Sequence, residues 1–112
     1  MEESISKNEV KNIMAQELKE MLGKDGSEVL LLDVREEREL TGELGHIEGI
    51  VHIPIGSLAF RLSELQNYKD KNIVIICRSG RRATTGAQIL NNAGFVNVSV
   101  LKGGMLSWNK YN

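Results

Sequence analysis

The 112-residue chain contains one cysteine, one proline and few aromatic residues, which make up 4% of the sequence. One cysteine excludes an internal disulfide, and with only two histidines it argues against a structural zinc site. The net charge of −1 gives no reason to expect nucleic acid or an anionic membrane surface as a partner. No stretch approaches the length of a membrane span, and residues 1–10 lack the apolar segment of a signal peptide. We therefore expect a cytoplasmic protein in a reducing compartment.

The chain has the length and the apolar content, 41% hydrophobic residues, of one domain with its own core. We expect a single domain over residues 1–112, with its core at about residues 10–108. Short apolar runs alternate with stretches of helical periodicity, and the alternation predicts an α/β fold, a parallel five-stranded sheet with helices on both faces. The expected strands are residues 10–14, 29–32, 50–53, 73–76 and 98–101, the expected helices are residues 15–22, 36–40, 57–65, 83–93 and 104–110, and Asp25 and Gly26 mark a turn.

One stretch, residues 72–95, combines a buried strand, a loop with the single cysteine, and a helix. Residues 73–76 are four β-branched apolar residues without polar alternation, which is typical of a parallel strand covered on both faces. In residues 83–93, Ala83, Ala87 and Leu90 fall on one helical face. The loop between them therefore lies at the carboxyl end of the sheet, where α/β proteins bind their ligands.

Cys77 opens this loop and is the candidate nucleophile. The first N–H groups of a helix lack partners within the helix and carry the positive end of its dipole, so they favour an anion such as a thiolate. An inert cysteine at the end of a core strand is the alternative. One glycine and three arginines are poor packing material and good material for holding an anion, which favours the nucleophile. The candidate anion-binding residues are Arg78, Ser79, Gly80, Arg81 and Arg82.

Four segments together resemble the rhodanese-like sulfurtransferases in their single-domain form. They are LLDVREERE at residues 31–39, GHIEGIVHIP at 45–54, VIICRSGRRA at 74–83 and LKGGMLSW at 101–108. The resemblance implies a six-residue active-site loop, residues 77–82, and a persulfide formed on Cys77. It implies a thiosulfate sulfurtransferase, in which sulfur passes from a small donor such as thiosulfate or a persulfide to cyanide or a thiol, thioredoxin-like proteins included. No metal and no organic cofactor are implied.

Two other functions remain open on the same fold. One is a phosphatase or arsenate reductase. The loops of those enzymes resemble one another in having five residues between the cysteine and an arginine. Here four residues separate Cys77 from Arg82, and Ala83 stands where the arginine of those enzymes would be. The other is a protein-binding module without catalysis. The spacing between Asp33 and His46 is slightly longer than is usual in the family, and Glu39 stands where some two-domain members carry a substrate-binding arginine, so the donor stays open.

Several polar residues outside the loop have more than one interpretation. Asp33 and Arg35 either line the site or cap a turn and pair at the surface. Arg82 either binds substrate or braces the loop against Asp33 or Glu39. His46 is expected to make a structural hydrogen bond. We expect His52, in a short strand, to be a packed or edge histidine, Gly103 and Gly104 to make a tight turn, and Trp108 to anchor the last helix.

Overall fold

The fold is an α/β sandwich built on five parallel strands, as the sequence predicts. The computed structural model describes residues 10–24 and 28–111, so the turn expected at Asp25 and Gly26 lies outside the described residues. The strand order is β1-β5-β4-β2-β3, and every pairing is parallel. The strands are β1 (Lys11–Ile13), β2 (Val29–Asp33), β3 (Val51–His52), β4 (Asn72–Ile76) and β5 (Val98–Leu101).

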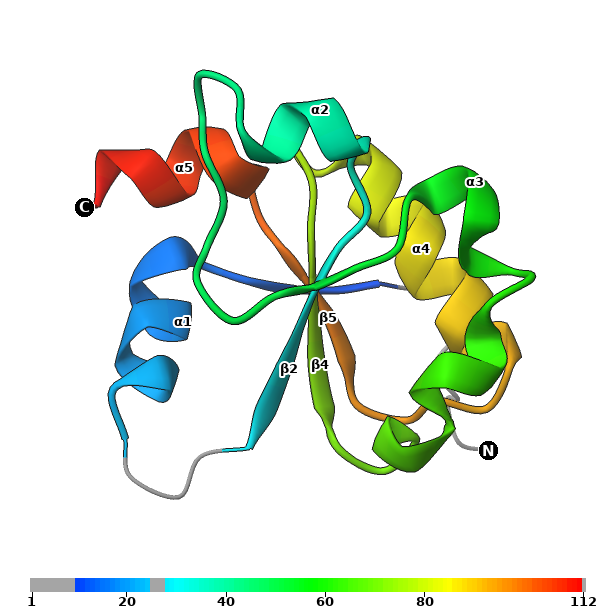
Figure 1. Ribbon diagram of the computed structural model, residues 1–112. Coiled ribbons are helices and arrows are strands. Elements are labelled where there is room, and N and C mark those ends of the chain that lie inside the picture. The colour runs from blue at the N-terminus through cyan, green and yellow to red at the C-terminus, as the bar shows by residue number, and fades with distance from the viewer. Residues whose placement is uncertain (1–9, 25–27, 112) are drawn as a thin grey trace.

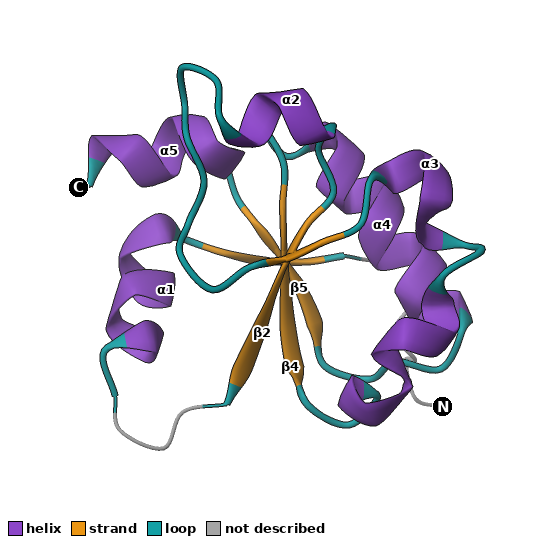
Figure 2. Ribbon diagram, viewed as in Figure 1, coloured by secondary structure: helices purple, strands orange, loops and turns teal. Residues whose placement is uncertain are grey.

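Helices cover both faces of the sheet (Figures 1 and 2). One face carries α1 (Ala15–Leu22) and α5 (Gly104–Lys110), and the other carries α3 (Ile55–Leu58) and α4 (Arg81–Asn92). The short helix α2 (Glu37–Leu40) lies over the carboxyl ends of the parallel strands. Two separate clusters of buried residues fill the two sides, with Leu18 and Trp108 in one and Leu58 and Leu90 in the other. Among the described residues, no helix is long and apolar enough to cross a membrane.

The central strand β4 is buried on both faces, because neighbouring strands and both helical layers surround it. Its four β-branched residues, Ile73, Val74, Ile75 and Ile76, are at most 2% exposed, which confirms the prediction from the unbroken apolar run. Asp33 at the end of β2 is in register with Ile76 at the end of β4, and the Val34 N–H donates to the Ile76 carbonyl at 3.0 Å. Cys77 therefore stands at the carboxyl edge of the sheet.

The expected single helix over residues 57–65 is wrong. The chain instead forms α3, which ends at Leu58, and a separate 3₁₀ helix, η1 (Leu62–Tyr68). Pro54 precedes α3 with a φ of −58° and starts the helix two residues early, while Arg61 leaves the helical region with a φ of −112°. Leu62 and Leu65 are three residues apart, the period of a 3₁₀ helix, so both still face the core.

Candidate active site

The Cys77 sulfur lies inside the loop, where backbone N–H groups point at it. Gly80 donates its N–H to Sγ at 3.0 Å, and Ala83 donates its N–H to Sγ at 3.4 Å. Cys77 is a free cysteine and is 1% exposed. Hydrogen bonds from two N–H groups stabilise negative charge on a sulfur at this position. Ala83 was not among the predicted site residues, and it contributes only its backbone; its place in the first helical turn is the signal that could have found it.

The loop is shorter than its six residues suggest, because α4 begins at Arg81 and not at residue 83. Gly80 is the N-cap of α4 and has a φ of +116°, a conformation that residues with a side chain rarely adopt. This turn brings the Gly80 N–H back to the sulfur. Thr84 then donates both its N–H and its hydroxyl to the Gly80 carbonyl, at 3.0 and 2.9 Å, and so fixes the first turn of α4.

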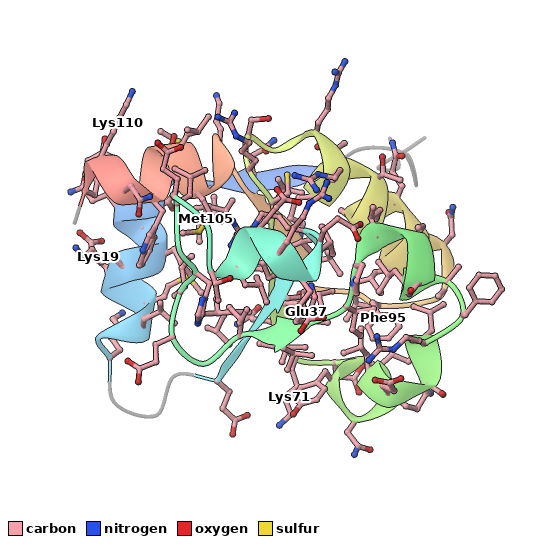
Figure 3. All side chains as sticks on the ribbon, turned by 45° about the horizontal axis from the view of Figure 1, so that its top comes forward. Lys19, Glu37, Lys71, Phe95, Met105 and Lys110 are labelled. Atoms are coloured by element: carbon pink, nitrogen blue, oxygen red, sulfur yellow. The ribbon has the colours of Figure 1, made fainter. Side chains whose placement is uncertain are left out.

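The opposite side of the loop rests on the N-terminal turn of α5. Met105 donates its N–H to the Cys77 carbonyl at 2.9 Å, and Leu106 donates its N–H to the Arg78 carbonyl at 3.2 Å. Gly104 has a φ of +56°, and a Cβ there would collide with backbone atoms of Cys77 and Arg78. Figure 3 shows Met105 at this end of α5, where its side chain is 1% exposed. The tight turn predicted at Gly103 and Gly104 is therefore also the support of the cysteine loop.

Arg82 forms a two-pronged ion pair with Glu39 of α2. Its Nη1 and Nη2 donate to the two carboxylate oxygens at 2.7 and 2.9 Å. These hydrogen bonds lower the pKa of Glu39 to about 2, from its ordinary 4.5, and Glu39 in turn raises the pKa of Arg82. Of the two partners proposed for Arg82, the structure selects Glu39. The pair joins α2 to the first turn of α4 beside the sulfur.

Asp33 and Arg35 pair with each other in the interior, and not at the surface as one interpretation held. The Arg35 guanidinium donates to both Asp33 oxygens, at 2.9 to 3.2 Å, and the two side chains are 1% and 0% exposed. Arg35 also donates to the carbonyls of Glu39 and Gly45, at 3.3 and 2.7 Å. Arg35 thereby ties α2 and the chain after it to the end of β2. Its positive charge is paired with Asp33 in the interior and is not available to a ligand. Arg35 therefore serves as part of the wall of the site.

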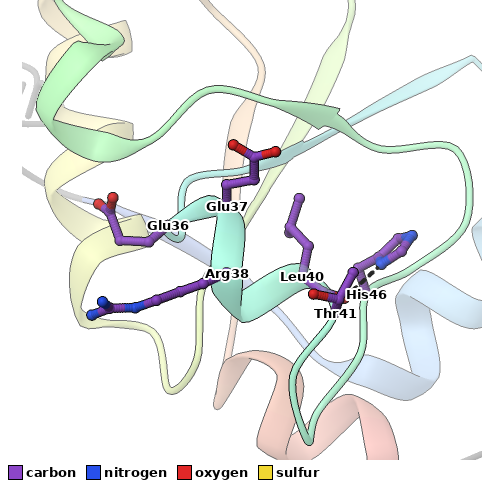
Figure 4. Close-up of a pocket in the computed structure, with 6 residues that line it drawn as sticks. All are labelled: Glu36, Glu37, Arg38, Leu40, Thr41 and His46. Carbon is purple, nitrogen blue, oxygen red and sulfur yellow. Dashed lines mark hydrogen bonds between the residues drawn. The ribbon is translucent and has the colours of Figure 1, made fainter.

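The remaining predicted residues divide between solvent and structural contacts. Arg78, Ser79 and Arg81 are exposed. His46 is exposed, with Nδ1 2.8 Å from the Leu40 carbonyl oxygen, and lines a wide pocket over α2, drawn in Figure 4. His52 lies on the edge strand β3, with Nε2 2.7 Å from the carbonyl oxygen of Arg35. His46 thus makes the structural hydrogen bond expected of it, and His52 is the edge histidine that the sequence predicts.

The site as a whole is a cysteine sulfur held by N–H groups, with exposed cations at its rim, on a parallel α/β domain. This is the arrangement of a protein that handles an anionic group at a cysteine. Sequence comparison identifies the family within this class, because residues 14–111 match the rhodanese-like domain. The chain belongs to the rhodanese-like family.

A Bacillus subtilis relative supports this assignment over nearly the full length of both proteins. The protein named "Putative sulfurtransferase YtwF" is 40% identical over 100 residues, 89% of this chain and 91% of the relative. A rhodanese-related protein from Thermoplasma volcanium has a solved structure with a TM-score of 0.76 and 31% identity, over 91% of this chain and 93% of that one. Sulfur transfer is thus supported at the level of the family.

Two further solved structures share the fold with this chain, and they differ in how much of their own length it covers. In Bacillus anthracis CoADR-RHD, at a TM-score of 0.76 and 32% identity, 89% of this chain matches only 16% of that chain. Rhodopseudomonas palustris RPA3614, of unknown function and described as a possible tyrosine phosphatase, matches 91% of this chain and 81% of its own, at a TM-score of 0.82 and 22% identity. The second likeness shows the fold alone.

Proposed function

We propose that the protein is a thiosulfate sulfurtransferase that carries sulfur as a persulfide on Cys77. The observation that carries the proposal is the pair of N–H groups, of Gly80 and Ala83, aimed at Sγ. The Cys77 thiolate attacks the outer sulfur of thiosulfate, the bond between the two thiosulfate sulfurs breaks, and sulfite leaves with its electron pair. The product is a Cys77 persulfide, and the total charge is unchanged. A thiol or cyanide then removes the outer sulfur and restores the thiolate.

The residues of the loop divide the work in this proposal. Gly80 allows the turn and supplies one N–H, and Ala83 supplies the second. Arg78 and Arg81 attract the anionic donor from solvent, and Ser79, exposed at the rim, can add a hydroxyl hydrogen bond. We give Arg82 a share in the local positive charge, reduced by its pairing with Glu39. The reaction uses no metal and no organic cofactor, and a thioredoxin-like protein can serve as the acceptor thiol in a reducing cytoplasm.

Mass spectrometry of the intact protein after thiosulfate treatment tests the proposal. Because Cys77 is the only cysteine, a gain of one sulfur that cyanide removes identifies the persulfide without mapping. Cys77→Ser is expected to keep the fold and lose the gain entirely, since a hydroxyl fills nearly the same space and cannot form a persulfide. Turnover of thiosulfate and cyanide by the serine variant would refute the mechanism.

A phosphatase or arsenate reductase is the alternative that the same experiment separates. Here the N–H groups of Gly80 and Ala83 converge on a single sulfur position, and the arginine follows after four residues and not five. We expect a smaller ring than a tetrahedral phosphate requires. Hydrolysis of aryl phosphates without persulfide formation would decide for the alternative. A domain that neither takes up sulfur nor hydrolyses phosphate would be a binding module.

A further inference from the structure

A pocket of about 240 Å³ opens beside the cysteine loop, between the loop and the chain that follows α2. Arg78, the residue after Cys77, lies in its wall, and Arg38, Glu43 and Leu44 line it from the other side. The volume equals that of about eight water molecules in the liquid. The pocket is therefore larger than a thiosulfate ion requires and has room for a small organic molecule.

The charged side chains of this pocket fall into two groups. Arg35 and Glu39, which also line it, are held by Asp33 and Arg82. Arg38, Glu43 and Arg78 are exposed, and their side chains have neither a hydrogen bond nor an ion pair with any other residue that the structure describes. In Figure 4 the Arg38 side chain extends away from Leu40, Thr41 and His46. The pocket thus offers two cations and one carboxylate to a ligand.

These charges select a ligand class. Guanidinium groups bind carboxylates through two parallel hydrogen bonds, and a carboxylate such as that of Glu43 accepts from an ammonium group. Leu44, half-buried in the wall, offers an apolar contact for methylene groups. The Leu106 N–H donates to the Arg78 carbonyl and holds the backbone of Arg78 in place next to Cys77. The Arg78 side chain therefore extends from a fixed position beside the cysteine. A small amino-acid or peptide thiol carries the matching groups.

We propose that this pocket binds the sulfur acceptor, a low-molecular-weight thiol with carboxylate groups held by Arg38 and Arg78 and an ammonium group that faces Glu43. The proposal rests on the proposed function, because the acceptor needs a persulfide on Cys77. The acceptor thiolate attacks the outer sulfur, the sulfur–sulfur bond of the persulfide breaks, and its electron pair returns to Cys77 as thiolate. The acceptor leaves as a persulfide, so neither an oxidant nor a reductant is consumed.

The test compares acceptors that differ in charge on protein already loaded with sulfur. Glutathione and 3-mercaptopropionate carry carboxylates; 2-mercaptoethanol and cyanide do not. With Arg38→Gln we expect the rate constant for sulfur removal to fall about tenfold for the first two and to change less than about twofold for the others. Glu43→Gln should slow cysteamine and glutathione but not 3-mercaptopropionate. Arg61→Gln, which removes an arginine outside the pocket, is the matched control and should leave all rates unchanged.

Three outcomes would overturn the proposal. Equal losses with every acceptor, or a slower loading from thiosulfate in Arg38→Gln, would show that Arg38 serves the donor or the general field. The second measurement needs no sulfur chemistry: S-methylglutathione, which cannot react, should shift the amide resonances of Arg38, Glu43 and Arg78 in the unmodified protein. Absence of these shifts at millimolar probe would refute the pocket. Failure to form a persulfide would instead refute the proposed function, while the binding measurement still decides on the pocket.

Discussion

Replacing Glu39 with glutamine tests the ion pair that joins α2 to the cysteine loop. The change keeps the size of the side chain and removes the charge that Arg82 holds through two hydrogen bonds of 2.7 and 2.9 Å. The fall in the pKa of Glu39 from 4.5 to about 2 would correspond to about 3 kcal/mol for a fully buried carboxylate. A quarter of the Glu39 side chain and a third of Arg82 meet solvent, so we expect Glu39→Gln to lower the free energy of unfolding by about 1 kcal/mol.

Urea unfolding, followed by the fluorescence of the single tryptophan Trp108, measures this loss. Because the pKa of Glu39 is lowered by folding, the stabilisation is complete above pH 4.5 and disappears as the pH falls towards 2, and the difference between variant and unmodified protein should vanish over that range. Glu64→Gln is the control: its exposed pair with Arg61 should contribute nothing measurable. The reasoning fails if Glu39→Gln costs nothing near neutral pH, or costs the same at pH 3 as at pH 7.

Two further predictions concern the rim and the support of the loop. Arg81→Glu should lower kcat/KM for thiosulfate by about tenfold at low salt, because it replaces attraction for a dianion with repulsion. The difference should shrink at high salt, and the midpoint of urea unfolding should not change. An unchanged kcat/KM would show that Arg81 only contacts solvent. Gly104→Ala should lower stability by about 2 kcal/mol and slow persulfide formation, because the new Cβ displaces the backbone of Cys77 and Arg78; loading at the normal rate in the folded variant would refute the role of α5 as support.

The fold could be predicted from the sequence because its signals are local. The apolar run before Cys77 predicts a strand, and the small residues after Arg82 predict a helix, both within about 20 residues of sequence. The structure confirms both elements. The failure over residues 57–65 is of a different kind. Leu62 and Leu65 are three residues apart, a spacing that fits both an α-helix and a 3₁₀ helix, and only packing against the core decides between them.

The contacts that complete the site could not be predicted in this way, because they join distant parts of the chain. Glu39 and Arg82 are 43 residues apart, and the choice between Asp33 and Glu39 depends on the register of β2 against β4 and on the direction of α2. From the sequence, Asp33 was an equally good candidate for the partner of Arg82. In the structure the Asp33 carboxylate is paired with Arg35. The support by α5 involves backbone groups only, which leave no trace in the residue types other than the glycine at position 104.

Pairing determines which arginines can act on a ligand. Arg35 and Arg82 are the least exposed arginines around the site, and each is paired with one carboxylate. The charge available to incoming thiosulfate therefore belongs to Arg78 and Arg81, both exposed. Backbone N–H groups meet the sulfur itself, and their dipoles are not screened by salt as exposed charges are. It follows that salt should slow the capture of thiosulfate yet leave a persulfide, once formed, equally well held.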